Sequence, residues 1–370
     1  MRLSEAAEPV FARHETFHPR FGWFRKAYAA AARDPHVFAS EDAPVQLGVG
    51  KNMVRSIRFW GLASKVLTEV PDPAAPSSGR KPKLVVPTRF GEALFGAGGW
   101  DPWMEDPGTH WLLHWRLLAP PCRLPVWWLS LCEFGAVEFE AEDLATSVTT
   151  QLRSVPGWKV PSESAVHKDV TAFVRTYGPA TRSSRESLDD AADCPLRLLR
   201  LVGRSEASGA HRYQLGPKPT LPGAVAAHAV LDWVARAGLG GQTATLERLA
   251  AERGSPADVF KLSAADLFAV LVPAVESMRS LDIATPVGVP QLAWRGDPGE
   301  IAAELLSLHY GRTSSDSAAG PSGDEAAAFG DESNAGAATP DVLTRLDSFQ
   351  ARRDTAQAGR RRVPDMERMR

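Results

Sequence analysis

The chain has 370 residues, and its 42 Lys and Arg nearly balance its 44 Asp and Glu, which leaves a formal net charge of −2. This length predicts two or three folded units with sizeable cores. No stretch approaches the roughly 20 apolar residues of a membrane-spanning helix, and the first residues lack the apolar run of a signal peptide. We therefore expect a soluble, cytoplasmic protein with no membrane partner.

Positive charge is concentrated near the N-terminus, because residues 11–91 contain thirteen Lys and Arg against six Asp and Glu. A first helix is predicted within residues 19–34, since prolines flank this segment at both ends. A short second helix is predicted over residues 40–47, where a serine and two acidic residues favour a helix start. The glycine-containing turn 48–50 separates it from a longer helix predicted over residues 51–67.

This longer helix is amphipathic. Apolar side chains recur at a spacing of three and four through Val54 and Ile57, so one stripe is expected to pack inward. Two helices joined by a tight turn form a helix-turn-helix, whose second helix enters the major groove of DNA. The side chains expected to contact DNA lie largely off the apolar stripe, at Lys51, Asn52, Arg55 and Arg58.

A hairpin is predicted after this helix, with strands over residues 65–71 and 83–87 and a loop rich in Pro, Ser and Gly between them. Its basic tip, Arg80, Lys81 and Lys83, is expected to meet DNA phosphates as a wing. Together these elements predict a winged helix-turn-helix DNA-binding domain over residues 11–95. Two alternatives stay open, because the cations can form a solvated face and some winged helices bind proteins instead of DNA.

A dense polar patch precedes the first long helix. His14, Glu15 and His18 have the side chains to bind a divalent metal or to act as acid and base. Their spacing matches no established metal motif, so a metal remains unknown, and the histidines can equally cap or pack. The three cysteines form no CxxC pair and lie among apolar neighbours, which predicts buried structural thiols.

A tryptophan-rich helical domain is predicted over residues 100–190. Trp111, His114 and Trp115 recur at helical spacing, which is more typical of a core than of a base-stacking platform. Further helices are expected over residues 148–153 and 164–177. Lys168 and Arg175 lie near one face of the latter helix and form either a second phosphate-contacting strip or a solvated face.

A second winged-helix-like unit is predicted over residues 191–310. It combines strands near residues 198–202 and 211–215 with helices near 221–237, 245–253 and 263–280, and it has no basic recognition face. Dimerisation or partner docking is its expected use. Residues 311–370 lack large apolar side chains at first and then become basic, which predicts a disordered tail. The predicted fold class is mainly α with small β-hairpins.

Several motifs resemble the SspB family, a bacterial family of DNA phosphorothioation proteins. They begin with His14-Glu15-Thr16-Phe17, Pro19-Arg20 and Gly22-Trp23 and continue with Gly48-Val49-Gly50-Lys51-Asn52-Met53 and Arg58-Phe59-Trp60. The run from Gly48 to Met53 is the fairly specific one. Weaker similarity continues through Trp111-Leu112-Leu113-His114-Trp115, His167-Lys168-Asp169-Val170, Cys194-Pro195-Leu196 and Phe260-Lys261-Leu262, so that the resemblance covers roughly residues 10–295.

This resemblance implies action in a defence system that replaces a non-bridging phosphate oxygen of DNA by sulfur. The implied partners are double-stranded DNA, a cysteine desulfurase, an ATP-pyrophosphatase-like sulfur-transfer protein and an ATPase, with a homodimer as an open alternative. A DNA-nicking role is assigned within the family, which implies Mg²⁺ or Mn²⁺ as cofactor. Of the site residues, only the DNA-binding positions Lys51, Asn52, Arg55 and Arg58 are carried over from the resemblance.

Motifs for nicking are absent from the sequence. There is no paired-carboxylate-and-lysine nuclease motif, and Gly48-Val49-Gly50-Lys51 lacks the glycine spacing of a phosphate loop. A nicking site would therefore be unorthodox, with His14, Glu15 and His18 as its candidates. The leading hypothesis is a DNA-binding component that nicks or presents duplex DNA for sulfur insertion. A non-enzymatic adaptor and a transcriptional regulator are the alternatives, so catalysis remains open.

Overall fold

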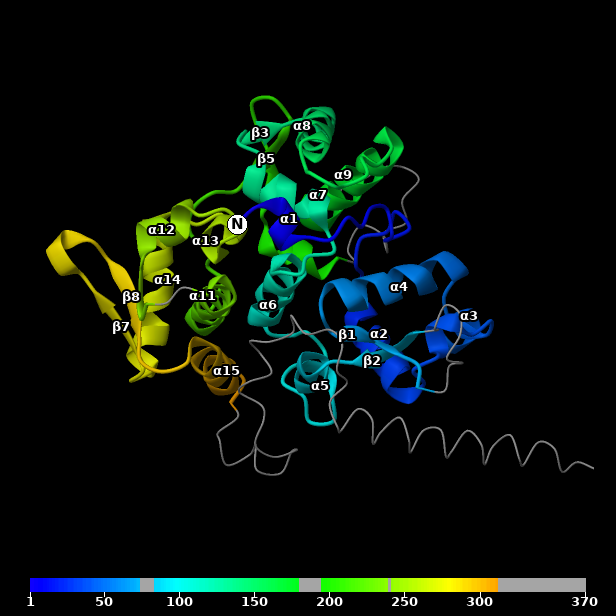
Figure 1. The fold of residues 1–370 in the computed structure, drawn as a ribbon, viewed down its shortest axis with the longest axis horizontal. Coiled ribbons are helices and arrows are strands. Elements are labelled where there is room, and N and C mark those ends of the chain that lie inside the picture. Colours follow the sequence, from blue (N-terminus) through cyan, green and yellow to red (C-terminus); the bar gives the residue numbers. More distant parts are fainter. Residues whose placement is uncertain (74–82, 180–193, 239–240, 312–370) are drawn as a thin grey trace, which may run out of the picture.

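The computed structural model describes residues 1–73, 83–179, 194–238 and 241–311 (Figure 1). In these residues the protein is mainly helical with three small antiparallel sheets, which confirms the predicted mainly α class. The helices and strands of residues 23–87 lie on one side of the molecule, and the strands and helices of residues 243–294 lie on the other (Figure 1). The predicted wing-tip residues Arg80 and Lys81 and the predicted tail beyond residue 311 lie outside the described residues.

The N-terminal third contains short and longer helices followed by a two-stranded hairpin. Its elements are α1 (Leu3–Ala6), α2 (Trp23–Arg33), the 3₁₀ turn η1 (Val37–Ala39), α3 (Ala43–Leu47), α4 (Lys51–Ala63), β1 (Leu67–Pro71), β2 (Lys83–Pro87) and α5 (Arg89–Phe95). Gly48 ends α3 in the left-handed conformation, with φ of 65°, and Gly50 precedes α4 in an extended one. Glycine adopts the first conformation without steric cost, so the turn follows directly from the sequence.

Helix α4 packs closely against α2, so its opposite face is left exposed. At Gly61 a Cβ atom would lie 2.9 Å from the Cβ of Ala27 on α2 and 2.7 Å from Cδ1 of Leu67, so only glycine fits without displacement. Antiparallel pairing of β1 with β2 then sets Leu67 opposite Pro87 and Pro71 opposite Lys83. The predicted strand over 83–87 is therefore confirmed, whereas the first strand begins two residues later than predicted.

The middle of the chain supplies most of the aromatic core. It contains α6 (Pro107–Leu118), α7 (Pro125–Trp128), the π-helical turn η2 (Leu129–Glu133), β3 (Glu138–Phe139), α8 (Ala141–Arg153) and α9 (Glu163–Tyr177). Trp111, Trp115, Trp127 and Trp128 are almost completely buried, as expected for core residues. Helix α8 begins before the predicted segment, because Glu140 and Asp143 form a capping box at its start.

The C-terminal part holds two further sheets. Its elements are η3 (Pro195–Leu199), β4 (Val202–Arg204), β5 (His211–Tyr213), α11 (Gly223–Ala237), β6 (Thr243–Thr245), α12 (Leu246–Ala251), α13 (Pro256–Phe260), α14 (Ala264–Ser277), β7 (Leu281–Ala284), η4 (Pro286–Gly288), β8 (Gln291–Trp294) and α15 (Pro298–His309). The strand predicted over 198–202 is displaced: a 3₁₀ turn ends at Leu199, Arg200 follows it with φ of 50°, and β4 begins only at Val202. The side chains of Thr245 and Ser263 cap the starts of α12 and α14.

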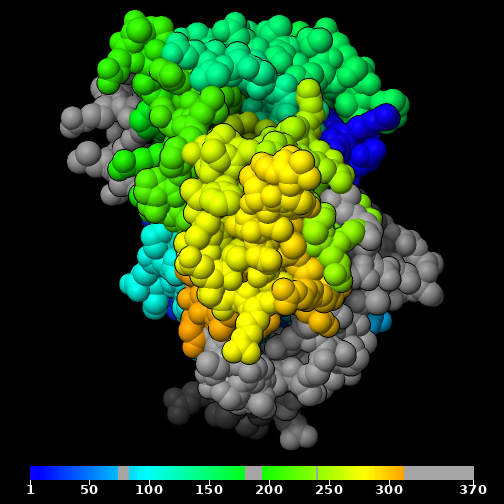
Figure 2. All heavy atoms as spheres, turned by 90° about the vertical axis from the view of Figure 1, so that its left-hand side faces the viewer, coloured from blue at the N-terminus to red at the C-terminus, as the bar shows by residue number. Residues whose placement is uncertain are grey.

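Strands β6, β8 and β7 form a sheet that the sequence analysis missed. The β7–β8 hairpin, α14 and α15 contribute to the face shown in yellow and orange in Figure 2, on the far side of the molecule from α3 and α4. Phe268, Val287 and Val289 are exposed on these elements. Helix α14 contains no Lys or Arg, so it lacks the basic residues that α4 carries.

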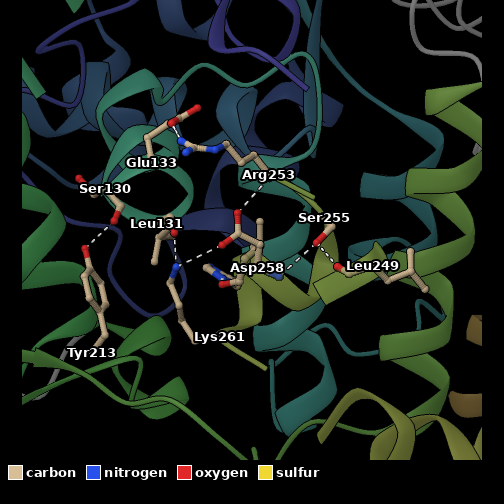
Figure 3. A network of polar contacts seen from close by, with 12 residues as sticks. Ser130, Leu131, Glu133, Tyr213, Leu249, Arg253, Ser255, Asp258 and Lys261 are labelled. Carbon is tan, nitrogen blue, oxygen red and sulfur yellow. Dashed lines mark hydrogen bonds and ion pairs between the residues drawn. The ribbon is translucent and has the colours of Figure 1, made fainter. Parts of the chain in front are cut away.

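A polar network ties the π-helical turn to the C-terminal part (Figure 3). The hydroxyl of Tyr213 donates to the carbonyl of Ser130 at 2.6 Å, and the Lys261 ammonium donates to the carbonyl of Leu131. Arg253 forms an ion pair with Glu133 at the end of the same turn. These contacts satisfy carbonyl groups in and around a turn whose backbone bonding is irregular.

One cluster of buried apolar residues runs from Leu3 to Leu306. It joins the N-terminal third to the tryptophan-rich middle and to the C-terminal helices, so the exposed face of α4 rests on a large common core. The division into units near residues 95–100 and 190 stays a prediction.

Candidate nucleic-acid interface

The first two turns of α4 present a basic surface. Lys51, Asn52 and Arg55 are exposed, whereas Val54 and Ile57 on the opposite side are buried. The first turn contains no acidic residue, and no side chain caps the helix start. Cationic side chains therefore lie beside the positive end of the helix dipole, where acidic side chains would be more stable. This arrangement costs helix stability and concentrates positive potential at one exposed place.

Arg58 and Lys83 lie in a different electrostatic environment. Both contact the carboxylate of Glu69 on β1, with Lys83 Nζ 3.3 Å from Oε2, and Arg123 adds a third cation at 3.7 Å. Burial alone would raise the pKa of Glu69, but the charges of its three neighbours hold that pKa below its ordinary value. Glu69 thus stays ionised and partly neutralises Arg58 and Lys83, which makes them weaker candidates than Lys51. Among the residues that the structure describes, Arg55 has a single, more distant carboxylate neighbour, Glu15 at 3.8 Å.

The predicted acid–base patch does not come together as a set. His14 and His18 are buried, whereas Glu15 is half-buried and its carboxylate lies 3.8 Å from Nη1 of Arg55. Nε2 of His14 lies 2.6 Å from Oδ1 of Asp169, and Trp127 packs on its ring edge-to-face at 5.5 Å between ring centroids. Catalysis by this set stays a prediction, and it would require the two imidazoles to become exposed.

Asp169 is the partner that sequence reasoning missed. It lies on α9, 155 residues from His14, and it is buried on the same helix face as Val166, Val170 and Phe173. No spacing rule connects residues so far apart. A carboxylate on an apolar helical stripe is nevertheless a signal, because a buried charge needs a partner. Lys168 on the same helix is exposed, as is Arg175, so their role as a strip or a solvated face stays open.

A closed metal site is absent from the residues that the structure describes, since no three His, Cys, Asp or Glu side chains come close enough to share an ion. Mg²⁺ typically keeps several waters and takes one or two carboxylates together with substrate phosphates. No catalytic step is therefore assigned to a metal. The three cysteines are buried, as predicted, and burial raises the pKa of the Cys122 thiol to about 11, which disfavours a reactive thiolate.

Comparison with known proteins identifies the family. Over residues 11–310 the chain matches the family described as "Protein of unknown function (DUF4007)", and it belongs to that family. No curated protein matches the chain. None of the helices in the described ranges combines the length and apolar character needed to span a bilayer.

Two solved structures resemble the whole chain. The first, described as "SspB crystal structure", is 32% identical with a TM-score of 0.79, and the match covers 95% of this chain and 100% of that one. The second, described as "Magnesium ion-bound SspB crystal structure", is 31% identical with a TM-score of 0.80, and the match covers 95% and 99%. The predicted resemblance to the SspB family is thus confirmed over nearly the full length.

Proposed function

We propose that this protein is the DNA-engaging component of a phosphorothioate-modification system. In this proposal residues 11–95 act as a winged helix-turn-helix, with α4 in the major groove and the β1–β2 hairpin as the wing. The exposed basic start of α4 is the observation that carries the proposal. A surface of this kind suits a polyanionic duplex, because phosphates favour both the cations and the free amide groups of a helix start.

The chemistry of the surface favours contacts to the DNA backbone. Lys51 and Arg55 are flexible cations that suit phosphate oxygens, and Asn52 has the amide needed to reach a base edge. With few candidates for base contacts, affinity should depend strongly on salt and weakly on sequence. A transcriptional regulator would instead prefer one operator, so equal affinity for unrelated duplexes would count against that alternative.

Presenting DNA for sulfur insertion agrees best with the described residues, since they contain no assembled hydrolytic centre. Nicking is the second candidate, and the magnesium ion reported with a similar SspB structure is the observation that favours it. Glu15 beside Arg55 is the carboxylate we nominate to meet such an ion together with a DNA phosphate. His14 and His18 remain candidates that require local opening.

Two assays test the proposal. Fluorescence anisotropy with two unrelated duplexes should show similar affinities that weaken as salt rises, and Lys51→Ala or Arg55→Ala should reduce binding without lowering the melting temperature. A supercoiled-plasmid assay with Mg²⁺ or Mn²⁺ separates the two candidates. Relaxation that is lost in Glu15→Ala supports nicking, whereas DNA binding without relaxation supports a non-enzymatic adaptor.

Protein partners follow from the same proposal. A cysteine desulfurase, an ATP-pyrophosphatase-like sulfur-transfer protein and an ATPase would act on the DNA that this chain presents, and a homodimer remains open. Analytical ultracentrifugation of the purified chain, alone and with each partner in turn, tests these associations. Sedimentation of every mixture as separate components would contradict them.

A further inference from the structure

A strained loop lies beside the basic face of α4. Within five residues, Ala12, Glu15 and Thr16 adopt left-handed backbone conformations, with φ of 53°, 51° and 66°. Residues with a Cβ atom rarely adopt these angles, and they persist only when the surrounding structure fixes them. Such strain is concentrated at functional sites, so the contacts that hold this loop and the groups that it exposes are informative.

Two helices hold the loop in place. On α9, Oδ1 of Asp169 accepts a hydrogen bond from the backbone N–H of Ala12 at 2.9 Å and lies 2.6 Å from Nε2 of His14. On α4, the hydroxyl of Ser56 donates to the carbonyl of His14 at 3.0 Å. Asp169, His14 and Ser56 are all buried, so these bonds are shielded from water and connect α9, the loop and α4.

The loop exposes a cation between these two attachments. Arg13 lies between Ala12 and His14, and its side chain is exposed. Within the described part of the chain no carboxylate pairs with Arg13. The next residue but one, Glu15, contacts Arg55 on α4, which places this part of the loop against the exposed face of that helix.

We propose that Arg13 is a DNA-phosphate contact, and that Asp169 is a positioning residue that fixes it beside α4. This inference rests on the proposed function and extends the DNA surface from α4 to the preceding loop. A freely moving arginine loses rotational and backbone freedom on binding a phosphate. Asp169 holds the backbone N–H of Ala12 and the imidazole of His14, on either side of Arg13, before DNA arrives, so less freedom is lost on binding.

Salt-dependent binding of a duplex to the full chain tests the role of Arg13. Arg13→Ala should weaken binding roughly tenfold at low salt and reduce the slope of log affinity against log salt by about one, with an unchanged melting temperature. Arg279 is exposed beyond α14, so Arg279→Ala is a matched control that should bind like the wild type. An Arg13→Ala slope equal to that of the wild type would overturn the inference.

A double-mutant cycle tests the positioning role. If Asp169 acts through Arg13, Arg13→Ala should cost clearly less affinity in an Asp169→Asn background than in the wild type. Equal losses in both backgrounds would show that Asp169 is structural only. If Asp169→Asn fails to fold, Ser56→Ala replaces it, because it removes the other attachment of the loop. A smaller loss from Arg13→Ala in that background supports positioning of Arg13 by the held loop, and an equal loss overturns it.

Duplex binding by the wild-type chain shows whether this inference fails alone or together with the proposed function. No salt-dependent duplex binding by the wild type would overturn both. Binding that is weakened by Lys51→Ala or Arg55→Ala but unaffected by Arg13→Ala would overturn only the role of the loop.

Discussion

Charge reversal at Lys51 should move stability and DNA binding in opposite directions. Lys51 is the first residue of α4, it is exposed, and the first turn holds no acidic side chain. Replacing it by Glu changes an unfavourable interaction with the helix dipole into a favourable one, which should stabilise the fold by about 0.5–1 kcal/mol. In a protein of this size that corresponds to a rise in melting temperature of roughly 1 °C.

The same substitution should impair DNA binding. It removes one phosphate contact and adds a repulsive charge, so we expect affinity to fall at least roughly tenfold at low salt and the salt slope to decrease by about one. Thermal unfolding and fluorescence anisotropy on the same preparations measure both effects. Structural damage cannot explain this result, because damage would lower stability and binding together.

Two controls complete the experiment. Lys51→Gln removes the positive charge without reversing it and should give intermediate values in both assays. Arg279→Glu makes the same change in net charge on another face and should leave duplex affinity nearly unchanged. The reasoning would be refuted if Lys51→Glu lowered stability, or if Arg279→Glu weakened binding as much as Lys51→Glu.

Three further predictions concern Glu15, Gly61 and His114. Glu15→Gln removes the negative charge beside Arg55, so duplex affinity measured by anisotropy should increase several-fold. Gly61→Ala should destabilise the protein by about 1–3 kcal/mol in chemical unfolding, because the new Cβ atom meets α2 and β1. Burial lowers the pKa of His114 to about 4, whereas the unfolded chain binds this proton near pH 6.5, so stability should fall by about 3 kcal/mol as the pH drops from 6.5 to 4.

Each of these predictions has a contradicting outcome. Unchanged affinity of Glu15→Gln together with lost plasmid relaxation would assign this carboxylate to catalysis rather than to charge balance. If Gly61→Ala were as stable as the wild type, the contacts of α4 with α2 and β1 would yield without cost, contrary to the prediction. For His114, the comparison is the neutral variant His114→Gln, whose unfolding free energy should depend less on pH over this range. If the wild type and His114→Gln showed the same pH dependence, protonation of His114 would not be the cause of the loss of stability.

Local signals explain which parts of the fold could be predicted. The turn at Gly48 and the capping box of Ser263 with Asp266 involve residues within four positions of one another, so sequence spacing reveals them. The strands of the β6–β8–β7 sheet have three or four residues each, which is too short for an alternating pattern to show. Their pairing depends on contacts between distant segments instead.

Long-range contacts explain what could not be predicted at the candidate site. The exposed positions Lys51, Asn52 and Arg55 follow from helical periodicity alone. The burial of His14 depends on Asp169 in α9 and on aromatic rings from α4 and α7, which no local pattern connects. The neutralisation of Arg58 by Glu69 likewise depends on how β1 returns along α4.

Site-specific photo-crosslinking to a duplex tests most directly whether α4 meets DNA. A photoreactive amino acid at the exposed position 52, near the start of α4, should form a covalent adduct with bound DNA, whereas the same group at the exposed position 265 of α14 should not. Efficient binding of the duplex with no adduct from position 52, or an equal yield from position 265, would contradict the account.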